Sequence, residues 1–169
     1  SGMVTVPLDV KLTKYELKSI MLDCEPSVIM VSQHYLDTAL ALKQEISSIK
    51  HVIVMDEHSY NDGIKNIYEL PDCYNAKWRH RSSKSTAFII YTSGTTGRSK
   101  GVMLSQKNLF SAMPAFLDPF DDVKKYTGWN TDEFSSLSAL PMFHISAMTS
   151  LVSWSITGHS INLCNNLKY

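Results

Sequence analysis

The apolar positions near the start of the chain recur with the period of a helix. Glu16 lies three residues after Thr13, which is the spacing of a capping box at a helix N-terminus. The apolar positions that follow share one helical face: Leu17, Ile20 and Met21. Pro26 cannot continue a helix, so we expect this helix to end before it.

Three further apolar segments follow this helix. Segments 27–31 and 51–55 are short and apolar, as is typical of buried strands. Segment 35–49 repeats its apolar residues at helical spacing. Strand, helix and strand in this order predict a parallel βαβ unit over about residues 12–56.

For residues 57–169, the pattern predicts a connection followed by alternating strands and helices. Residues 57–84 are polar and rich in turn residues, with one short helix expected near 64–70. Residues 85–169 hold the remaining elements: strands at 86–91, 102–104, 136–140 and 160–164, and helices at 106–117 and 144–154. The pattern predicts an α/β fold, a mostly parallel sheet flanked by helices, in a single domain over 1–169.

Composition narrows the class of protein. The 169 residues are 44% hydrophobic, which is enough for a core and argues against disorder. Lysine plus arginine balances aspartate plus glutamate at 16 each, so no basic surface for nucleic acid is predicted. The three cysteines are widely spaced, which fits a reducing cytoplasm better than a disulfide framework or a zinc site. No apolar segment has the length of a transmembrane helix.

The segment from Tyr91 to Gly101 carries the candidate chemistry. Its glycines let the backbone approach a ligand closely, and its hydroxyls and turn N–H groups can donate to oxyanions. Lys100 adds a flexible point charge that suits phosphate. The predicted phosphate-binding residues besides Lys100 are Thr92, Ser93, Gly94, Thr95, Thr96 and Gly97.

Two widespread nucleotide-binding loops do not match this segment. A Walker A loop reads G-x-x-x-x-G-K-[ST] and opens a helix, whereas Gly94 and Gly97 are too close together and a strand-like run follows. The Rossmann pattern G-x-G-x-x-G is also absent. A flexible linker is disfavoured, because strongly apolar strands flank the loop on both sides.

The loop closely resembles the signature loop of the adenylate-forming superfamily. The likeness continues through Val102–Leu109, and two other segments agree in the right order, 6–17 and Leu140–Ile145. This superfamily includes acyl-CoA synthetases, aryl-CoA ligases, luciferases and adenylation domains of peptide synthetases. Ser99 departs from the pattern, because family members commonly have proline there.

The resemblance implies a reaction in two halves. A carboxylate attacks the α-phosphate of ATP to give an acyl-adenylate and pyrophosphate, and a thiol of coenzyme A or a carrier protein then takes the acyl group. By resemblance, residues 92–97 and Lys100 would hold the β- and γ-phosphates, and Thr92 would help to place Mg²⁺. Attack of one anion on another depends on such charge neutralisation.

His144 indicates the class of carboxylic acid. A lone histidine beside apolar residues is more often structural, but by resemblance this one lies at the mouth of the acyl pocket and positions the substrate. Amino-acid-activating members typically carry an aspartate there, and residues 134–169 contain no acidic side chain. An unpaired ammonium in a buried pocket would be costly. The expected substrate is therefore a fatty or aryl acid. Three apolar positions would suit its pocket or, equally, a plain helix core: Ile145, Ala147 and Met148.

The resemblance also implies parts that these residues do not contain. An adenine-binding segment, a ribose-binding aspartate and a C-terminal domain with a catalytic lysine would follow Tyr169. We therefore expect a fragment of the N-terminal domain that is inactive alone, holds no catalytic residue, and pairs with a second copy through exposed sheet edges. One alternative is a non-catalytic interaction or regulatory module that kept the loop. The other, an unrelated phosphate-binding protein such as a kinase, is disfavoured by segment 140–145.

Overall fold

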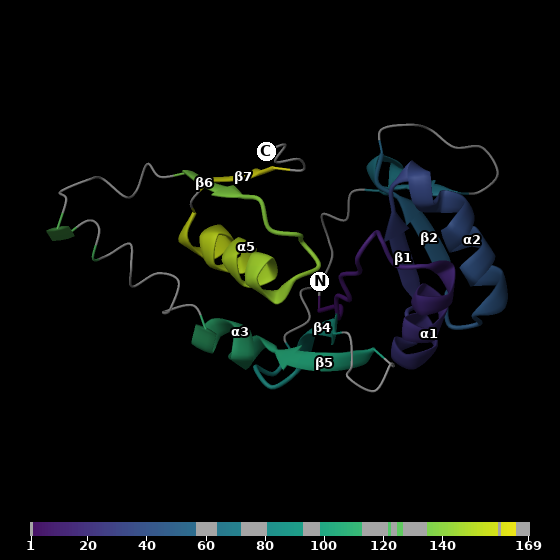
Figure 1. Cartoon of the computed structure of the whole chain (residues 1–169), viewed down its shortest axis with the longest axis horizontal. Coiled ribbons are helices and arrows are strands. Elements are labelled where there is room, and N and C mark those ends of the chain that lie inside the picture. Colours follow the sequence, from purple (N-terminus) through teal and green to yellow (C-terminus); the bar gives the residue numbers. More distant parts are fainter. Residues whose placement is uncertain are drawn as a thin grey trace. The chain divides into compact units, whose positions relative to one another are not determined.

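The computed structural model shows helices and short strands in two compact units (Figure 1). One unit contains residues 10–78, and the other contains residues 1–9 together with 79–169. The predicted βαβ unit lies in the first, and the predicted phosphate loop belongs to the second. The structure describes residues 2–56, 64–71, 81–92, 99–112, 122, 125–126, 135–158 and 160–164.

Helix α1 spans Lys14–Cys24 and begins as the sequence predicts. The Glu16 carboxylate accepts from the Thr13 backbone N–H at 2.8 Å, and the Thr13 hydroxyl accepts from the Glu16 N–H at 3.3 Å. Hydrogen bonds from the Thr13 hydroxyl and backbone lower the pKa of Glu16. The helix ends at Glu25, which has a left-handed conformation with φ 46°, immediately before Pro26.

The predicted parallel βαβ unit is confirmed. Strand β1 (Val28–Val31) pairs in parallel with β2 (His51–Val54), and a 3-10 turn η1 (Gln33–Tyr35) and helix α2 (Leu36–Glu45) connect them. The expected helix over 35–49 was too long at its C-terminal end, because Ile46 is already extended, with φ −125° and ψ 107°.

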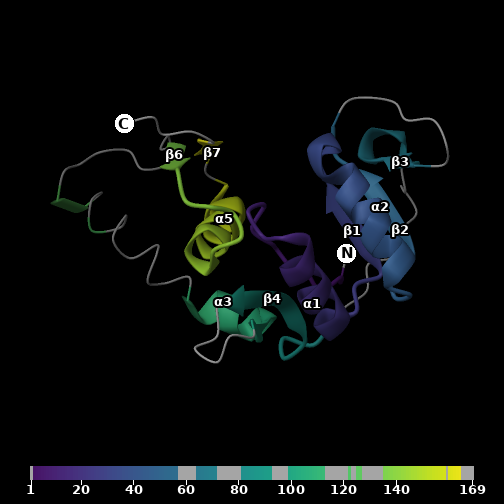
Figure 2. The same cartoon turned by 45° about the vertical axis from the view of Figure 1, so that its right-hand side comes forward.

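The connection after β2 contains a strand where the sequence predicts a short helix. Strand β3 (Lys65–Asn66) pairs in parallel with β2 and makes the sheet order β1-β2-β3 (Figure 2). Only a 3-10 turn, η2 (Ile67–Glu69), follows it. The short helix expected near 64–70 is therefore confirmed only as this 3-10 turn, and β3 replaces its first part.

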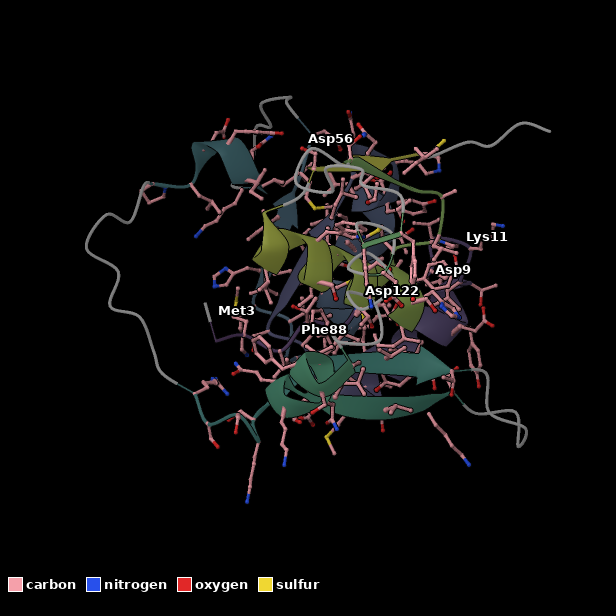
Figure 3. All side chains as sticks on the ribbon, turned by 90° about the vertical axis from the view of Figure 1, so that its left-hand side faces the viewer. Met3, Asp9, Lys11, Asp56, Phe88 and Asp122 are labelled. Atoms are coloured by element: carbon pink, nitrogen blue, oxygen red, sulfur yellow. The ribbon has the colours of Figure 1, made fainter. Side chains whose placement is uncertain are left out.

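Polar side chains tie the carboxyl ends of these strands together. The Asp56 carboxylate, labelled in Figure 3, accepts from the Gln33 backbone N–H at the start of η1. Asn66 is 2% exposed and donates from its amide to the Asp56 carbonyl at 2.6 Å. Its amide oxygen accepts from the Tyr68 N–H at 2.9 Å, so this buried polar group has partners on both sides.

The core of this unit comes from one face of α2 and from the sheet it covers. Leu42 is 1% exposed and Val54 is fully buried. Ile46 and Ile49 remain buried beyond the end of the helix. Burying one such side chain stabilises the fold by about 1.5–3 kcal/mol.

In the other unit, a central strand is paired on both edges. Strand β4 (Thr86–Thr92) is antiparallel to β5 (Lys100–Ser105). On the opposite edge, the Thr5 backbone bonds in parallel to both neighbours of Phe88, a residue labelled in Figure 3. The two distances are 2.9 Å to the Ala87 carbonyl and 3.0 Å from the Ile89 N–H. Helix α3 (Gln106–Ala112) follows β5.

A second βαβ unit closes the described part of the chain. Strand β6 (Ser135–Ser138) pairs in parallel with β7 (Ser160–Leu163), and helix α5 (Ile145–Thr157) connects them. Gly158 ends the helix at φ 78°, a conformation that favours glycine. Strand β6 ends earlier than the expected 136–140, and the expected extension of α3 to 117 lies outside the described residues.

The predicted α/β fold with mainly parallel strands is confirmed. The β4–β5 hairpin is antiparallel, whereas the other strand pairs are parallel. Within the described residues, no helix is both long and apolar enough to cross a bilayer.

Candidate active site

The predicted phosphate loop is closed by a pair of residues at the end of the β4–β5 hairpin. Thr92 and Lys100 are the last paired positions of β4 and β5. Residues directly opposite in an antiparallel pair present their side chains on the same face. The Thr92 hydroxyl and the Lys100 ammonium therefore belong to one face of the hairpin, at the base of the loop.

Lys100 is available for an anionic ligand. Lys100 is exposed to solvent. The ion pairs found among the described residues do not include it, because they join Lys14 and Lys18 to Glu45. No described carboxylate neutralises Lys100. An unneutralised ammonium beside a hydroxyl suits a phosphate oxygen, because the ammonium supplies charge and both groups can donate hydrogen bonds.

Gly101 has a different role from the one that the sequence predicts. A Cβ atom built on Gly101 would lie 2.8 Å from Ile89 Cγ2 and 3.0 Å from Tyr91 Cζ. Gly101 is not among the described glycines with positive φ. The absence of a side chain makes room for Tyr91, its partner across the hairpin, on the face opposite to Thr92 and Lys100.

The remaining predicted loop residues lie outside the described residues: Ser93, Gly94, Thr95, Thr96 and Gly97. Their phosphate contacts stay predictions. Thr92, predicted to help place Mg²⁺, is exposed and can offer one oxygen ligand. Among the described residues, no cluster of three or more histidine, cysteine or acidic side chains could hold a metal. Thr92 fits Mg²⁺ only as a partner to phosphate oxygens and water.

His144 lies at the N-cap of α5, where its side chain bonds to the backbone. Its Nδ1 accepts a hydrogen bond from the Ser146 N–H at 3.3 Å. The His144 backbone N–H donates to the Pro141 carbonyl at 2.9 Å, which fixes the turn before the helix. The residue is exposed, so the rest of the imidazole remains accessible.

A pocket of about 130 Å³ lies between α5 and the β6–β7 pair. Leu140 and Met142, just before His144, contribute to its wall. The helix contributes Ala147, Ser150, Leu151 and Trp154. The strands contribute Ser136, Leu137, Ser138, Ile161 and Leu163. None of its lining residues has an ionisable side chain, so the pocket is suited to an uncharged group.

The sequence identified only part of this wall. Ala147 is one of the positions expected to suit an apolar pocket, but Ile145 and Met148 do not line the pocket. Trp154 and the pocket serines were missed. The spacing of Ala147, Ser150 or Leu151, and Trp154 along one helical face could have indicated Ser150 and Trp154, but not the serines of β6.

Comparisons with known proteins identify the family of this chain. A family model for AMP-binding enzymes matches residues 1–167. The mitochondrial malonate–CoA ligase ACSF3 of Xenopus laevis is 28% identical over 145 residues, which cover 86% of this chain and 23% of that ligase. The chain therefore spans less than a quarter of the length of this relative.

Solved structures show the same fold. A red-emitting luciferase from Phrixothrix hirtus superposes with a TM-score of 0.80 at 19% identity, over 99% of this chain and 33% of the luciferase. ATP-bound MatB from Rhodopseudomonas palustris gives a TM-score of 0.65 at 24% identity, over 95% of this chain and 30% of MatB. The resemblance seen in the sequence is confirmed: this chain belongs to the AMP-binding enzyme family.

Proposed function

We propose that this chain is part of an ATP-dependent acid–thiol ligase, which activates a carboxylic acid as an acyl-adenylate before transfer to a thiol. The observation that carries the proposal is the family match over residues 1–167. The pairing of Thr92 with Lys100 at the base of the phosphate loop supports it. ATP is the nucleotide, and coenzyme A or a carrier-protein thiol is the acceptor.

The hairpin base holds the pyrophosphate end of ATP. Lys100 supplies positive charge, and the Thr92 hydroxyl, with Ser93, Thr95 and Thr96, donates to the β- and γ-phosphate oxygens. Gly94 and Gly97 allow the backbone of the loop to come close to those oxygens. Mg²⁺, held partly by Thr92, would neutralise phosphate charge while a carboxylate attacks the α-phosphate.

The acyl group lies in the pocket between α5 and the β6–β7 pair. Its uncharged lining supports a fatty or aryl acid over an amino acid, whose ammonium would need a carboxylate partner. A cavity of roughly 150 Å³ holds benzene, so a pocket of about 130 Å³ favours a short acyl chain or a single aromatic ring. His144 precedes the helix of this pocket and positions the carboxylate.

The acyl pocket is tested by the acid preference of the whole protein. Thioester formation should be faster with butyrate or benzoate than with palmitate, malonate or phenylalanine. Trp154→Ala should enlarge the pocket and raise the rate with longer acids relative to butyrate. Ile156→Ala, at a helix position that is 53% exposed and outside the lining, is the matched control. An unchanged preference in Trp154→Ala would place the acyl group elsewhere.

The ligase proposal itself is tested by pyrophosphate exchange. The whole protein should exchange pyrophosphate into ATP only when a suitable acid is present. Residues 1–169 should not, because a phosphate loop cannot position both substrates without the adenine- and ribose-binding segments. Absence of acid-dependent exchange in the whole protein would contradict the ligase proposal. Turnover by residues 1–169 would contradict the assignment of inactivity to this part.

Location and assembly are further parts of the proposal. The wide cysteine spacing supports a cytoplasmic location. Val102 and Met103 on β5 are 48% and 69% exposed, which supports pairing between two copies of this chain. Analytical ultracentrifugation across a concentration series tests the dimer, which Met103→Lys should weaken.

The alternative function belongs to a different class of protein. It is a non-catalytic interaction or regulatory module that kept the phosphate loop. Such a module would bind ATP without forming an acyl-adenylate. Binding of ATP by the whole protein, measured calorimetrically, with no exchange for any acid in the panel would favour it.

A further inference from the structure

We infer that α5 holds neutral His144 as the tautomer with its proton on Nε2, so that the ring presents a hydrogen-bond donor to the substrate carboxylate. The tautomer follows from the geometry of the helix end. The role toward the carboxylate rests on the proposed function, which makes His144 a positioning residue.

The backbone around His144 is that of a helix N-cap. Its φ of −85° and ψ of 142° are extended, while its carbonyl already accepts the first helical bond from the Met148 N–H at 3.1 Å. The Ser146 N–H is among the first amides of the helix, which have no carbonyl partner within it. His144 Nδ1 satisfies that amide at 3.3 Å.

This bond determines where the neutral ring carries its proton. A neutral imidazole has one N–H donor and one bare acceptor nitrogen. An amide N–H can donate only to the bare nitrogen, so Nδ1 is unprotonated and Nε2 carries the hydrogen. Within the described chain, no hydrogen bond to Nε2 is recorded, and the residue is exposed.

The choice of histidine at this N-cap position also favours a role for Nε2. The preferred N-cap residues are serine, threonine, aspartate and asparagine. Histidine is not among them, so capping does not by itself explain His144. The imidazole caps with Nδ1 and keeps an N–H donor on Nε2, a combination that asparagine shares and aspartate lacks.

A hydrogen-bond donor and a general base at His144 would support different chemistry. With Nδ1 occupied by the Ser146 N–H, the neutral ring has no second bare nitrogen that could take a proton from a thiol. It can donate from Nε2 to a carboxylate oxygen, a charge-assisted bond that fixes the orientation of the acid for attack on the α-phosphate.

The tautomer of His144 can be tested without an activity assay. Proton–nitrogen correlation spectra of the chain with isotope-labelled histidine distinguish the two nitrogens, and the signals lost in His144→Asn identify His144 among the six histidines. At a pH where the ring is neutral, we expect the Nε2-protonated pattern. An Nδ1-protonated ring, or an averaged pattern like that of a free histidine, would overturn the inference.

The role toward the substrate is tested by three variants of the whole protein. His144→Asn and His144→Asp both keep a capping oxygen, but only asparagine also keeps an N–H donor. Both should melt near the wild-type temperature, whereas His144→Ala should melt lower. Acid-dependent exchange should fall at least about tenfold more in His144→Asp than in His144→Asn.

The variants also separate the ways in which this inference could fail. Equal activity of the asparagine and aspartate variants, or activity that follows melting temperature across all three, would overturn the donor role. A wild-type protein without acid-dependent exchange would instead overturn the proposed function, and the spectra would still decide the tautomer.

Discussion

Gly101 lies against the ring of Tyr91, its partner across the β4–β5 hairpin. A Cβ atom on Gly101 would lie 3.0 Å from Tyr91 Cζ and 3.2 Å from its hydroxyl oxygen. An aromatic side chain over a strand glycine is a known means of fixing strand register. The contact lies next to the Thr92–Lys100 pair, so it secures the base of the predicted phosphate loop.

Gly101→Ala should therefore disturb the loop through its base. The new methyl would lie 2.8 Å from Ile89 Cγ2, and overpacking of this kind costs about 1–3 kcal/mol. We expect a lower melting temperature and a higher KM for ATP in the whole protein. The control is a double-mutant cycle with Ile89→Ala, which removes the nearest clashing atom. Strictly additive effects would show that this clash is not the cause.

Lys100→Ala should weaken ATP use more than acid use. A hydrogen bond to a charged group is worth about 1.5–3 kcal/mol, which corresponds to a loss of about tenfold or more in kcat/KM for ATP. Lys100→Arg should keep part of the rate, because it keeps the charge. Lys107→Ala is the matched control, since Lys107 is also exposed but lies on α3 beyond the hairpin. Equal effects of the two alanine variants would remove Lys100 from the phosphate site.

Leu42→Ala should destabilise the unit of residues 10–78. Leu42 is 1% exposed on α2, and replacing a buried leucine by alanine costs about 2–5 kcal/mol. Leu22→Ala on α1 is the control, because Leu22 is 55% exposed and surface substitutions usually change stability by less than about 0.5 kcal/mol. Urea unfolding of both variants measures the difference. Similar losses would contradict the position of Leu42 in the core.

Helices and strands that depend on local sequence signals were predicted well. The errors in the predicted elements come from contacts between residues that are distant in sequence. The capping box of Thr13 and Glu16 was predictable because both partners lie within one helical turn. Strand β3 was not, because Lys65 and Asn66 carry no apolar alternation and form a strand only by pairing with β2. Ile46 continues the buried pattern of α2 after the helix has ended, so periodicity overestimated its length.

The same distinction applies to the candidate site. Residue types in the glycine-rich loop made Lys100 a candidate, and the resemblance to the family motif made His144 a candidate, because both signals are visible in the sequence. The sequence could not show that Lys100 pairs with Thr92, because register depends on both strands. It also attributed Gly101 to ligand approach, whereas the tertiary contact with Tyr91 explains it.

Acid should weaken the connection between α1 and α2 through Glu45. Its carboxylate accepts hydrogen bonds from Lys14 and Lys18, each at 2.7 Å, and these lower its pKa to about 2. In the unfolded chain its pKa is about 4.3, so the unfolded state binds more protons between these values. The stabilisation is complete above the unfolded pKa and is lost as pH falls toward 2.

Because both ion pairs of Glu45 are partly exposed, their effect on stability is modest and salt reduces it. Urea unfolding from pH 6 down to about 3 should show a shallower loss of stability in Glu45→Gln than in the wild type. Equal slopes would mean that this carboxylate is not held by the two lysines in solution.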